Sequence, residues 1–337
     1  MDGLAHGFTL QTQPTAQHTL KQPIDCVGTG LHSGRKVSLR LLPAAADTGI
    51  VFRRTDIAGG PVDIPARFDH VVDTNLCTVL ALPERPETRT GTVEHLMAAL
   101  VGAGISNAVV ELDGPEVPIL DGSAEPFSFL IGCAGTLEQN AAAPVIQVLR
   151  PVRVEQGEAF AELRPIVGDA TMAQAPVLQA SVSIAFDATA IGRQALSLPI
   201  TPASFRNELA RARTFAQMQE IEQLHAAGLA LGGSLENAVV VDGDRVMNPD
   251  GLRMRDEFVR HKLLDMVGDL GLAGATLQAR LVAHRPGHAL NNQLLRALFA
   301  NAANWRWASV AAQVQPGGTT GLPVWQETRL PVAAGPF

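Results

Sequence analysis

Apolar and polar positions alternate in several short segments of the first part of the chain. This pattern is typical of strands that bury one face. Val37 to Leu42 alternates in this way, and Val51 to Arg54 resembles its partner strand. Thr92 to Val101 has a helical pattern, with Thr92 as its expected N-cap and two glycines at its end. Asn107 to Leu112 is predicted to be the strand that follows.

The second part of the chain repeats the order of strands first and helices afterwards. Alternation predicts strands at 152–155, 160–163, 178–184 and 278–283. Helical patterns occur at 215–227, 256–270 and 291–305. The helix at 256–270 is the strongest, because acidic residues occupy its first turn and Gly271 follows its last. This order predicts an α+β fold of two halves, since a parallel α/β fold would alternate strands and helices strictly.

A shift in composition near residues 140–144 marks the expected boundary between the halves. The predicted organisation is a polar N-terminal extension (1–18), a first α+β domain (19–142), a second α+β domain (143–312) and a Gly/Pro-rich C-terminal tail (313–337) that is expected to be poorly ordered.

Composition narrows the classes of function. The apolar fraction of 46% over 337 residues is enough for a sizeable core. A formal net charge of −7 argues against a broad nucleic-acid-binding surface, although it leaves room for a local phosphate pocket. The three cysteines are too few and too scattered for a disulfide framework, and no apolar segment is long enough for a membrane helix. We therefore expect a cytoplasmic chain that would meet any lipid substrate from the water side.

The 256–270 helix carries the first candidate for chemistry. His261 and Asp265 are four residues apart, so their side chains lie on one face and can reach a common point. Neutral imidazole and carboxylate are both good zinc donors, and the pair could form two-thirds of a zinc site. The alternative is an exposed pair joined by a hydrogen bond.

Glu94 and His95 are the best candidates to complete such a site. A carboxylate and an imidazole side by side near a helix start offer a general base and a third ligand. The alternative is a capped surface turn. Together with His261 and Asp265 they supply two histidines and one aspartate with an open fourth position, which is the pattern of a catalytic zinc ion.

Two further histidines lie in loops. His288 follows Gly287 between a strand and a helix, which suits an acid that protonates a leaving amine, although a helix-capping role fits too. Asp269, one turn beyond Asp265, could hold this histidine protonated, or be a solvated carboxylate. His32 lies in a glycine-rich turn that could approach a ligand, but a tight connection between strands would look the same.

These motifs, in this order, resemble the UDP-3-O-acyl-N-acetylglucosamine deacetylases, which commit Gram-negative bacteria to lipid A synthesis. The resemblance runs from about Thr19 to Trp307. It rests on seven segments: Thr29–Gly34 (TGLHSG), Thr92–Leu100 (TVEHLMAAL), Pro118–Phe127 (PILDGSAEPF), Ala212–Phe215 (ARTF), Gly228–Ser234 (GLALGGS), Asp256–Asp265 (DEFVRHKLLD) and Gly287–Asn292 (GHALNN).

The resemblance implies a fold and a set of roles. It implies two similar halves, each a small sheet with a pair of helices, and helices sandwiched between the sheets. It implies one zinc ion bound by His95, His261 and Asp265, with Glu94 as general base and His288 as general acid, assisted by Asp269. The implied reaction hydrolyses the N-acetyl group of UDP-3-O-(3-hydroxyacyl)-N-acetylglucosamine to the free amine and acetate. We expect the protein to act as a monomer.

The resemblance also implies residues that contact the substrate. Lys262 would contact its polar head, Thr214 would help to stabilise the oxyanion, and Phe215 would lie against the substrate. The segment from Phe215 to about Val241 matches an insert that forms a passage for the acyl chain. Leu231 and Leu235 contribute apolar side chains to it, although a core-facing stripe would look identical.

Two positions depart from the family pattern. Asn75 replaces a methionine expected next to the acyl site, and Leu163 stands where an aromatic residue often lies near the nucleotide. These departures leave the acyl preference and the nucleotide packing open. Two other functions remain as alternatives, namely a zinc amidase for another acylated sugar or a peptide, and a non-catalytic module that binds lipid or nucleotide.

Overall fold

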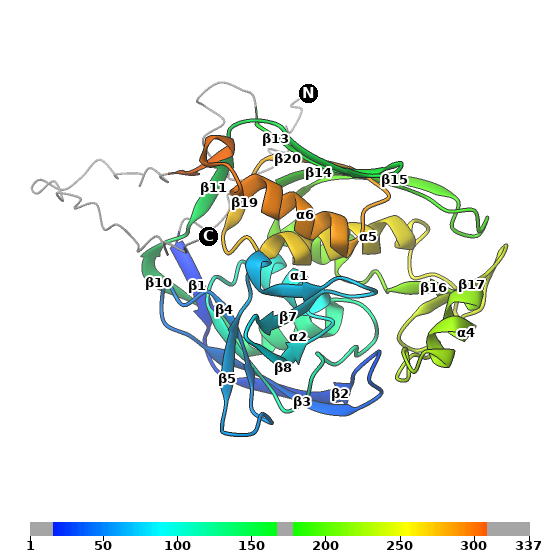
Figure 1. The fold of residues 1–337 in the computed structure, drawn as a ribbon, viewed down its shortest axis with the longest axis horizontal. Coiled ribbons are helices and arrows are strands. Elements are labelled where there is room, and N and C mark those ends of the chain that lie inside the picture. Colours follow the sequence, from blue (N-terminus) through cyan, green and yellow to red (C-terminus); the bar gives the residue numbers. More distant parts are fainter. Residues whose placement is uncertain (1–15, 167–177, 309–337) are drawn as a thin grey trace, which may run out of the picture.

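A computed structural model describes residues 16–166 and 178–308. Two five-stranded sheets form the outer layers, and two pairs of helices fill the space between them (Figure 1). One hydrophobic core runs through both halves and includes residues from both sheets and from the helices between them. The predicted α+β fold, with helices sandwiched between the sheets of two halves, is confirmed.

The first half consists of one sheet, in the order β2-β3-β9-β4-β5, and two helices. Its elements are β2 (Ile24–Thr29), β3 (Lys36–Pro43), β4 (Ile50–Arg54), β5 (Val62–Pro65), α1 (Glu94–Gly102), β9 (Ala108–Leu112) and α2 (Glu125–Ala134). Buried and exposed residues alternate along β3, as the sequence pattern predicted. The prediction that β4 pairs with β3 is wrong, because β9 lies between them, antiparallel to β3 and parallel to β4.

The second half has the same connectivity, with the sheet order β12-β13-β20-β14-β15. Its elements are β12 (Val152–Gln156), β13 (Ala159–Arg164), β14 (Leu178–Ala185), β15 (Arg193–Ile200), α5 (Glu257–Gly271), β20 (Arg280–His284) and α6 (His288–Phe299). Four strands, a helix, a central strand and a second helix follow one another in both halves. The central strands β9 and β20 each run parallel to the third strand of their half.

Each half carries an insert between its fourth strand and its first helix. The first insert is the sheet of β6 (Val71–Asp73), β7 (Val79–Leu82) and β8 (Arg85–Thr90). The second contains α3 (Pro202–Ser204), β16 (Phe215–Gln217), α4 (Met218–Ala226), β17 (Val239–Asp242) and β18 (Arg245–Val246). Both inserts therefore lead directly into the helices that carry the candidate metal ligands.

Short pairings at the sides complete the fold. The pairs are β1 (Ala16–Leu20) with β10 (Thr136–Ala142), and β11 (Val145–Val148) with both β19 (Thr276–Gln278) and β21 (Trp305–Ala308). The first strand thus begins at Ala16, inside the predicted N-terminal extension. The predicted C-terminal tail lies outside the described residues.

Three predicted helix boundaries are corrected by the structure. The N-cap of α1 is Val93, because Thr92 has a positive φ of 55° and donates its hydroxyl hydrogen to Glu116. The segment predicted as one helix from Phe215 begins instead as β16, which pairs in parallel with β17, and α4 follows. The predicted helix at 291–305 begins earlier, at His288, and ends at Phe299.

The two helices that carry the candidate ligands contact each other directly. α1 packs against α5, and both are buried over most of their residues. The helix expected at 256–270 is present as α5, and its large apolar residues are buried: Phe258, Val259, Leu263, Leu264, Val267 and Leu270. In the described part of the chain, no helix has the length and apolar character needed to cross a membrane.

Candidate metal centre and active site

Three donor side chains meet where the first turn of α1 faces α5. His95 Nε2 lies 3.6 Å from Asp265 Oδ1, and His261 Nε2 lies 3.2 Å from the same oxygen. The two imidazole rings meet edge to face, with 4.9 Å between their centroids. The ligand atoms of all three residues lie within 4.8 Å of one another, and all three side chains are buried. The alternative of an exposed surface pair at His261 and Asp265 is therefore wrong.

The hydrogen bonds around these donors fit a bound cation. His261 Nδ1 lies 3.0 Å from the carbonyl oxygen of Ala212 and therefore donates its hydrogen there. In the neutral ring Nε2 is then a lone-pair acceptor that faces Asp265 Oδ1. That oxygen is buried and accepts no hydrogen bond from any residue in the ranges that the structure describes. Two acceptors facing each other in a buried place repel, and a shared cation removes the repulsion.

The charges of these side chains also suit metal ligands. Burial acts to raise the pKa of Asp265, but the charges of His261 and Lys262 outweigh it and hold this pKa well below its usual value. Burial lowers the pKa of His95, which favours the neutral imidazole. The site therefore offers one carboxylate and neutral imidazole nitrogen, the forms that bind a metal ion.

Glu94 lies at the start of α1, directly beside His95, and is buried. Its Oε2 accepts the backbone hydrogen of Thr78 at 3.1 Å, and its Oε1 lies 3.8 Å from His288 Nε2. Burial raises the pKa of Glu94 to about 7, with the charges of Asp269 and Asp265 adding to it and that of His288 opposing it. A carboxylate with a pKa near neutrality can both accept and release a proton at physiological pH.

His288 is the first residue of α6, and it faces both Glu94 and Asp269. Its Nδ1 lies 2.8 Å from Asp269 Oδ2. Burial acts to lower the pKa of His288, but the charges of Asp269 and Glu94 outweigh it and raise this pKa to about 9. The imidazole is therefore protonated at neutral pH and can donate a hydrogen from Nε2 towards the space beside Glu94.

The chain was compared with known protein families and curated proteins. Residues 17–300 match the family model described as UDP-3-O-acyl N-acetylglycosamine deacetylase. The chain belongs to this family.

Proteins named UDP-3-O-acyl-N-acetylglucosamine deacetylase are similar to it over most of their length. The one from Shewanella frigidimarina is 48% identical over 295 residues, which cover 87% of this chain and 92% of the relative. The one from Acidithiobacillus ferrooxidans is 49% identical over 302 residues, 89% of this chain and 95% of the relative. The one from Aliivibrio fischeri is 46% identical over 310 residues, which cover 89% of this chain and 98% of the relative.

Two of the remaining residues implied by the family lie close to the metal ligands. Lys262 Nζ donates to Asp265 Oδ2 at 3.0 Å and lies 5.5 Å from the centroid of Phe215. Burial acts to lower the pKa of Lys262, but the charges of Asp265 and Asp269 raise it overall, so the ammonium stays charged. The Phe215 ring lies 6.3 Å from that of His261 and 5.0 Å from that of Phe258. It forms one wall beside the candidate ligands.

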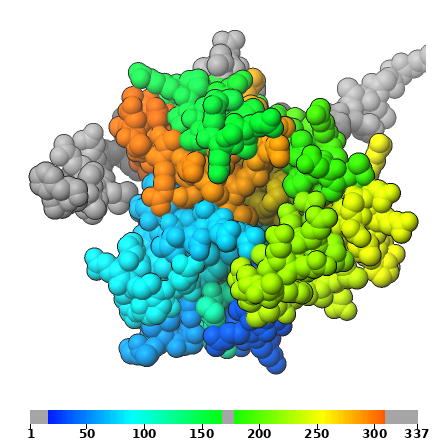
Figure 2. Space-filling model, turned by 45° about the vertical axis from the view of Figure 1, so that its right-hand side comes forward, coloured from blue at the N-terminus to red at the C-terminus, as the bar shows by residue number. Residues whose placement is uncertain are grey.

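The glycine-rich turn of the first half contacts the insert of the second half. The backbone of Leu231 donates to His32 O at 3.3 Å, and that of Gly232 donates to Leu31 O at 2.9 Å. Figure 2 shows the yellow-green insert resting against the blue start of the chain. The side chains of Leu231 and Leu235 are 58% and 41% exposed, so neither belongs to the core, as a core-facing stripe would require.

His32 has a ring with two buried nitrogens that bond to no protein atom among the described residues. Burial lowers the pKa of His32; the charge of Glu116 opposes this effect and that of His288 adds to it. Among the described residues the Thr214 hydroxyl forms no hydrogen bond, although its backbone is held by Gly122 and Val239.

Three residues that the sequence analysis missed support this site. Thr78 Oγ1 donates to Asp269 Oδ1 at 2.6 Å, and Asn291 Nδ2 donates to Asp269 Oδ2 at 2.8 Å. Glu116 accepts hydrogens from the backbones of His32 and Ser33 and thereby fixes the glycine-rich turn. Asn291 could have been found from the sequence, because it follows His288 by three residues on one helix and therefore lies on the same face. Thr78 and Glu116 are far from the other site residues in the sequence, and only the folded structure brings them close.

The two departures from the family pattern lie in different surroundings. Asn75 is exposed, in the turn before β7, and its backbone donates to Asp73. Leu163 is fully buried in β13, between Val152 and Leu281 on the neighbouring strands. Within the described part of the chain, neither residue forms a hydrogen bond or an ion pair with the candidate ligands.

Proposed function

We propose that this protein hydrolyses the acetamide group of UDP-3-O-(3-hydroxyacyl)-N-acetylglucosamine to the free amine and acetate, the committed step of lipid A biosynthesis. The observation that carries the proposal is the meeting of His95, His261 and Asp265 beside Glu94 and His288, in a chain of the deacetylase family. A lipid- or nucleotide-binding module would have no need of a buried base and a buried acid next to three metal donors.

We propose zinc as the metal and His95, His261 and Asp265 as the residues that hold it. Two imidazole nitrogens and one carboxylate oxygen are a common donor set for catalytic zinc, and they leave one position for water or substrate. A zinc ion bound there would supply Lewis acidity, which lowers the pKa of water and polarises an amide carbonyl.

Glu94 is the proposed general base. Its carboxylate accepts a proton from the attacking water as the oxygen–carbon bond to the acetyl carbonyl forms. Thr78 supports this role, because its backbone N–H fixes one carboxylate oxygen and leaves the other directed towards His288. A single positioned general base contributes ~10²–10⁴-fold to a rate.

His288 is the proposed general acid. Its imidazolium donates a proton to the glucosamine nitrogen as the carbon–nitrogen bond breaks, so that a neutral amine and acetic acid form, and the acetic acid loses its proton to solvent to become acetate. Asp269 accepts the Nδ1 hydrogen of His288, which directs the Nε2 hydrogen towards the reaction. The proton held by Glu94 and the one lost by His288 are then exchanged with solvent.

Other residues are proposed to bind the substrate. The Lys262 ammonium would contact the polar head, and the Thr214 hydroxyl would donate to the developing oxyanion. The unpartnered ring of His32 could bond to the nucleotide-linked sugar. Phe215, with Leu231 and Leu235 on the insert, would contact the acyl chain, which accounts for apolar side chains left exposed there.

An assay with matched substrates tests the proposal. Purified protein with zinc should release acetate from the 3-O-acylated UDP-sugar at least ~10²-fold faster than from unacylated UDP-N-acetylglucosamine, since remote binding energy is used in the transition state. Equal rates would favour an amidase for a different acylated sugar. No hydrolysis of either compound, with zinc bound, would favour a binding module.

A further inference from the structure

A buried ion pair lies beneath the candidate site and has no part in the chemistry proposed above. Glu257 is fully buried, and Arg213 is only 6% exposed. The guanidinium of Arg213 donates to Glu257 through Nε at 2.9 Å and through Nη2 at 3.2 Å. Arg213 belongs to the ARTF segment and Glu257 to the DEFVRHKLLD segment, so each lies in a motif shared with the family.

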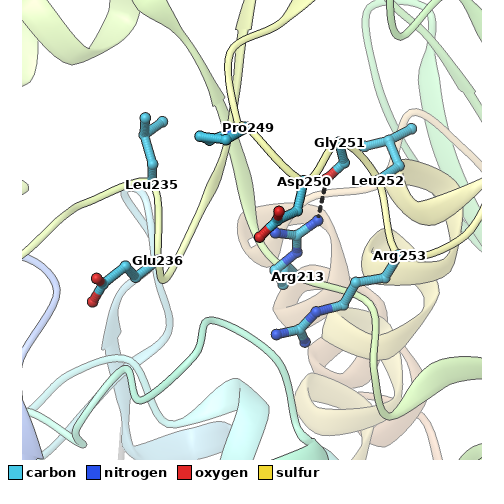
Figure 3. A pocket seen from close by; sticks show the side chains of 8 residues that line it. All are labelled: Arg213, Leu235, Glu236, Pro249, Asp250, Gly251, Leu252 and Arg253. Carbon is cyan, nitrogen blue, oxygen red and sulfur yellow. Dashed lines mark hydrogen bonds between the residues drawn. The ribbon is translucent and has the colours of Figure 1, made fainter.

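The pair joins three parts of the second half. Glu257 is the first residue of α5, and it also accepts the backbone hydrogen of Arg253 at 2.7 Å. Arg213 Nη2 donates to the carbonyl oxygen of Gly251 at 2.8 Å, drawn as the dashed line in Figure 3. The start of α5, the segment before β16 and the loop at 249–253 are therefore held together by charge-assisted hydrogen bonds.

One peptide group connects this ion pair to a candidate metal ligand. The backbone N–H of Arg213 donates to Glu257 Oε1 at 3.0 Å. The carbonyl of the same peptide group belongs to Ala212, and it accepts the Nδ1 hydrogen of His261 at 3.0 Å. The N–H and C=O of a trans peptide point in opposite directions, so the group passes the effect of the carboxylate on to the imidazole.

We propose that Glu257 is a positioning residue for His261, and that it acts through the 212–213 peptide group. Its negative charge polarises the peptide and strengthens the Ala212 carbonyl as an acceptor, because hydrogen bonds in a chain reinforce one another. A stronger acceptor on Nδ1 orients the ring and increases the electron density at Nε2, the nitrogen offered to the metal. Arg213 balances the buried charge of Glu257. The inference rests on the metal site of the proposed function.

Stability alone is a poor explanation for this arrangement. A buried ion pair gains little over an apolar pair of the same size, because both charges lose their hydration. The loss is compensated only where the geometry is good and further hydrogen bonds satisfy both charged groups. Here one of these bonds directs the carboxylate at the peptide that accepts the hydrogen of His261. Partners of this kind, when mutated, change metal affinity by ~10–100-fold in other proteins.

Glu257→Gln is the test, because glutamine keeps the shape and loses the charge. Zinc affinity is measured on the full chain by competition with a chromophoric chelator, without substrate. We expect Glu257→Gln to bind zinc ~10–100-fold more weakly, and to change the visible spectrum of the Co²⁺-loaded protein, which reports ligand geometry. Arg260→Gln is the control. Arg260 lies on α5, as Glu257 does, and forms ion pairs with Asp256 and Glu208, but neither pair includes the 212–213 peptide.

The outcomes separate this inference from a structural role and from the proposed function. Glu257→Gln with a lowered melting temperature but wild-type zinc affinity and Co²⁺ spectrum would overturn the inference. So would an equal loss of affinity in Arg260→Gln. Arg213→Lys keeps the Glu257 carboxylate and its contact to the peptide, so its zinc affinity should stay near the wild-type value; a loss as large as that of Glu257→Gln would overturn the inference. If glutamine prevents folding, Glu257→Asp provides the measurement, because the shorter side chain withdraws the carboxylate from the Arg213 N–H. Wild-type affinity in Glu257→Asp would then count against the inference. A wild-type protein that binds zinc but releases no acetate would refute the function alone.

Discussion

Gly268 of α5 faces the backbone carbonyl of Glu94, and no space for a side chain remains between them. A Cβ at this position would overlap the Glu94 carbonyl and approach the Ala98 nitrogen to 3.1 Å. The absence of a side chain lets the first turn of α1 contact α5 directly. That contact brings His95 on α1 next to Asp265, which lies one turn before Gly268 on α5.

Gly268→Ala should therefore destabilise the protein, although alanine favours helix formation over glycine by ~1 kcal/mol. The added methyl group must push the helices apart, which costs about 1–3 kcal/mol in a packed core. Zinc affinity should fall in parallel, since His95 moves away from its partners. Gly132→Ala is the control: Gly132 lies within α2 with nothing near its Cβ position, and this variant should be slightly stabilised. Chemical unfolding of both variants checks the prediction, which fails if Gly268→Ala is stabilised as well.

Glu94→Gln should remove the general base and leave the metal site intact. We expect kcat to fall by about 10²-fold or more, with bound zinc unchanged, because Glu94 is adjacent to the ligands without being one of them. Kinetics and metal analysis on the same sample check both parts. Glu125→Gln, at a half-exposed position at the start of α2, should keep full activity. Activity near the wild-type level in Glu94→Gln would remove Glu94 from its proposed role.

The pH dependence of kcat/KM should be bell-shaped. Glu94 must be ionised to accept a proton, so activity rises as the pH passes its pKa, which burial raises to about 7. His288 must be protonated, so activity falls as the pH passes its pKa, which Asp269 and Glu94 raise to about 9. A bound cation favours the carboxylate and disfavours the imidazolium, so both limbs should lie at or below these values.

Asp269→Asn tests whether His288 is the group behind the alkaline limb. The substitution removes the negative charge that holds His288 protonated, so its pKa should fall and the alkaline limb should move to lower pH. The acid limb should move in the same direction, because the charge of Asp269 also raises the pKa of Glu94. An alkaline limb that stays at its wild-type position would show that another group is the acid.

Thr78→Val tests the support of Asp269. The hydroxyl of Thr78 donates to the buried carboxylate, and a hydrogen bond to a charged group contributes about 1.5–3 kcal/mol. We expect a stability loss of that size and a lower kcat with little change in KM, because Asp269 then holds His288 less firmly. Thr90→Val is the matched control, since its buried hydroxyl donates to the Thr88 carbonyl and to no other described residue. If both variants keep wild-type kcat, Thr78 serves stability alone.

The parts of the fold that depend on local patterns could be predicted from the sequence. The helical period of α5 and the glycine at its end gave that helix within one residue at each end. The donor types and their spacing predicted His261 and Asp265 as a pair, and His95 as its partner. The structure brings these three donors together, as the few residue types that bind zinc and their helical spacing had suggested; their role as ligands stays a prediction.

Features that depend on long-range contacts could not be predicted from local patterns. Thr92 has the sequence of an N-cap, but Glu116 accepts its hydroxyl hydrogen and holds its backbone at a positive φ. Phe215 begins a helical pattern, yet pairing with β17 makes it a strand. Trp305 likewise belongs to a strand because β11, far away in the chain, pairs with it. Tertiary pairing outweighs local propensity in each case.

Metal removal should destabilise the protein without unfolding it completely. In the metal-free protein His261 Nε2 and Asp265 Oδ1 lie 3.2 Å apart with no cation between them, and a bound cation gives both atoms a shared partner. Zinc at ~100 times its dissociation constant should therefore add ~2.7 kcal/mol to the free energy of unfolding. The gain should shrink as the pH falls below about 6, because protonated imidazole cannot bind a metal ion. Calorimetry with and without a chelator measures it, and His95→Ala should abolish most of the increment. An equal rise in melting temperature in His95→Ala would mean that zinc binds elsewhere, and the site proposed on α1 and α5 would be wrong.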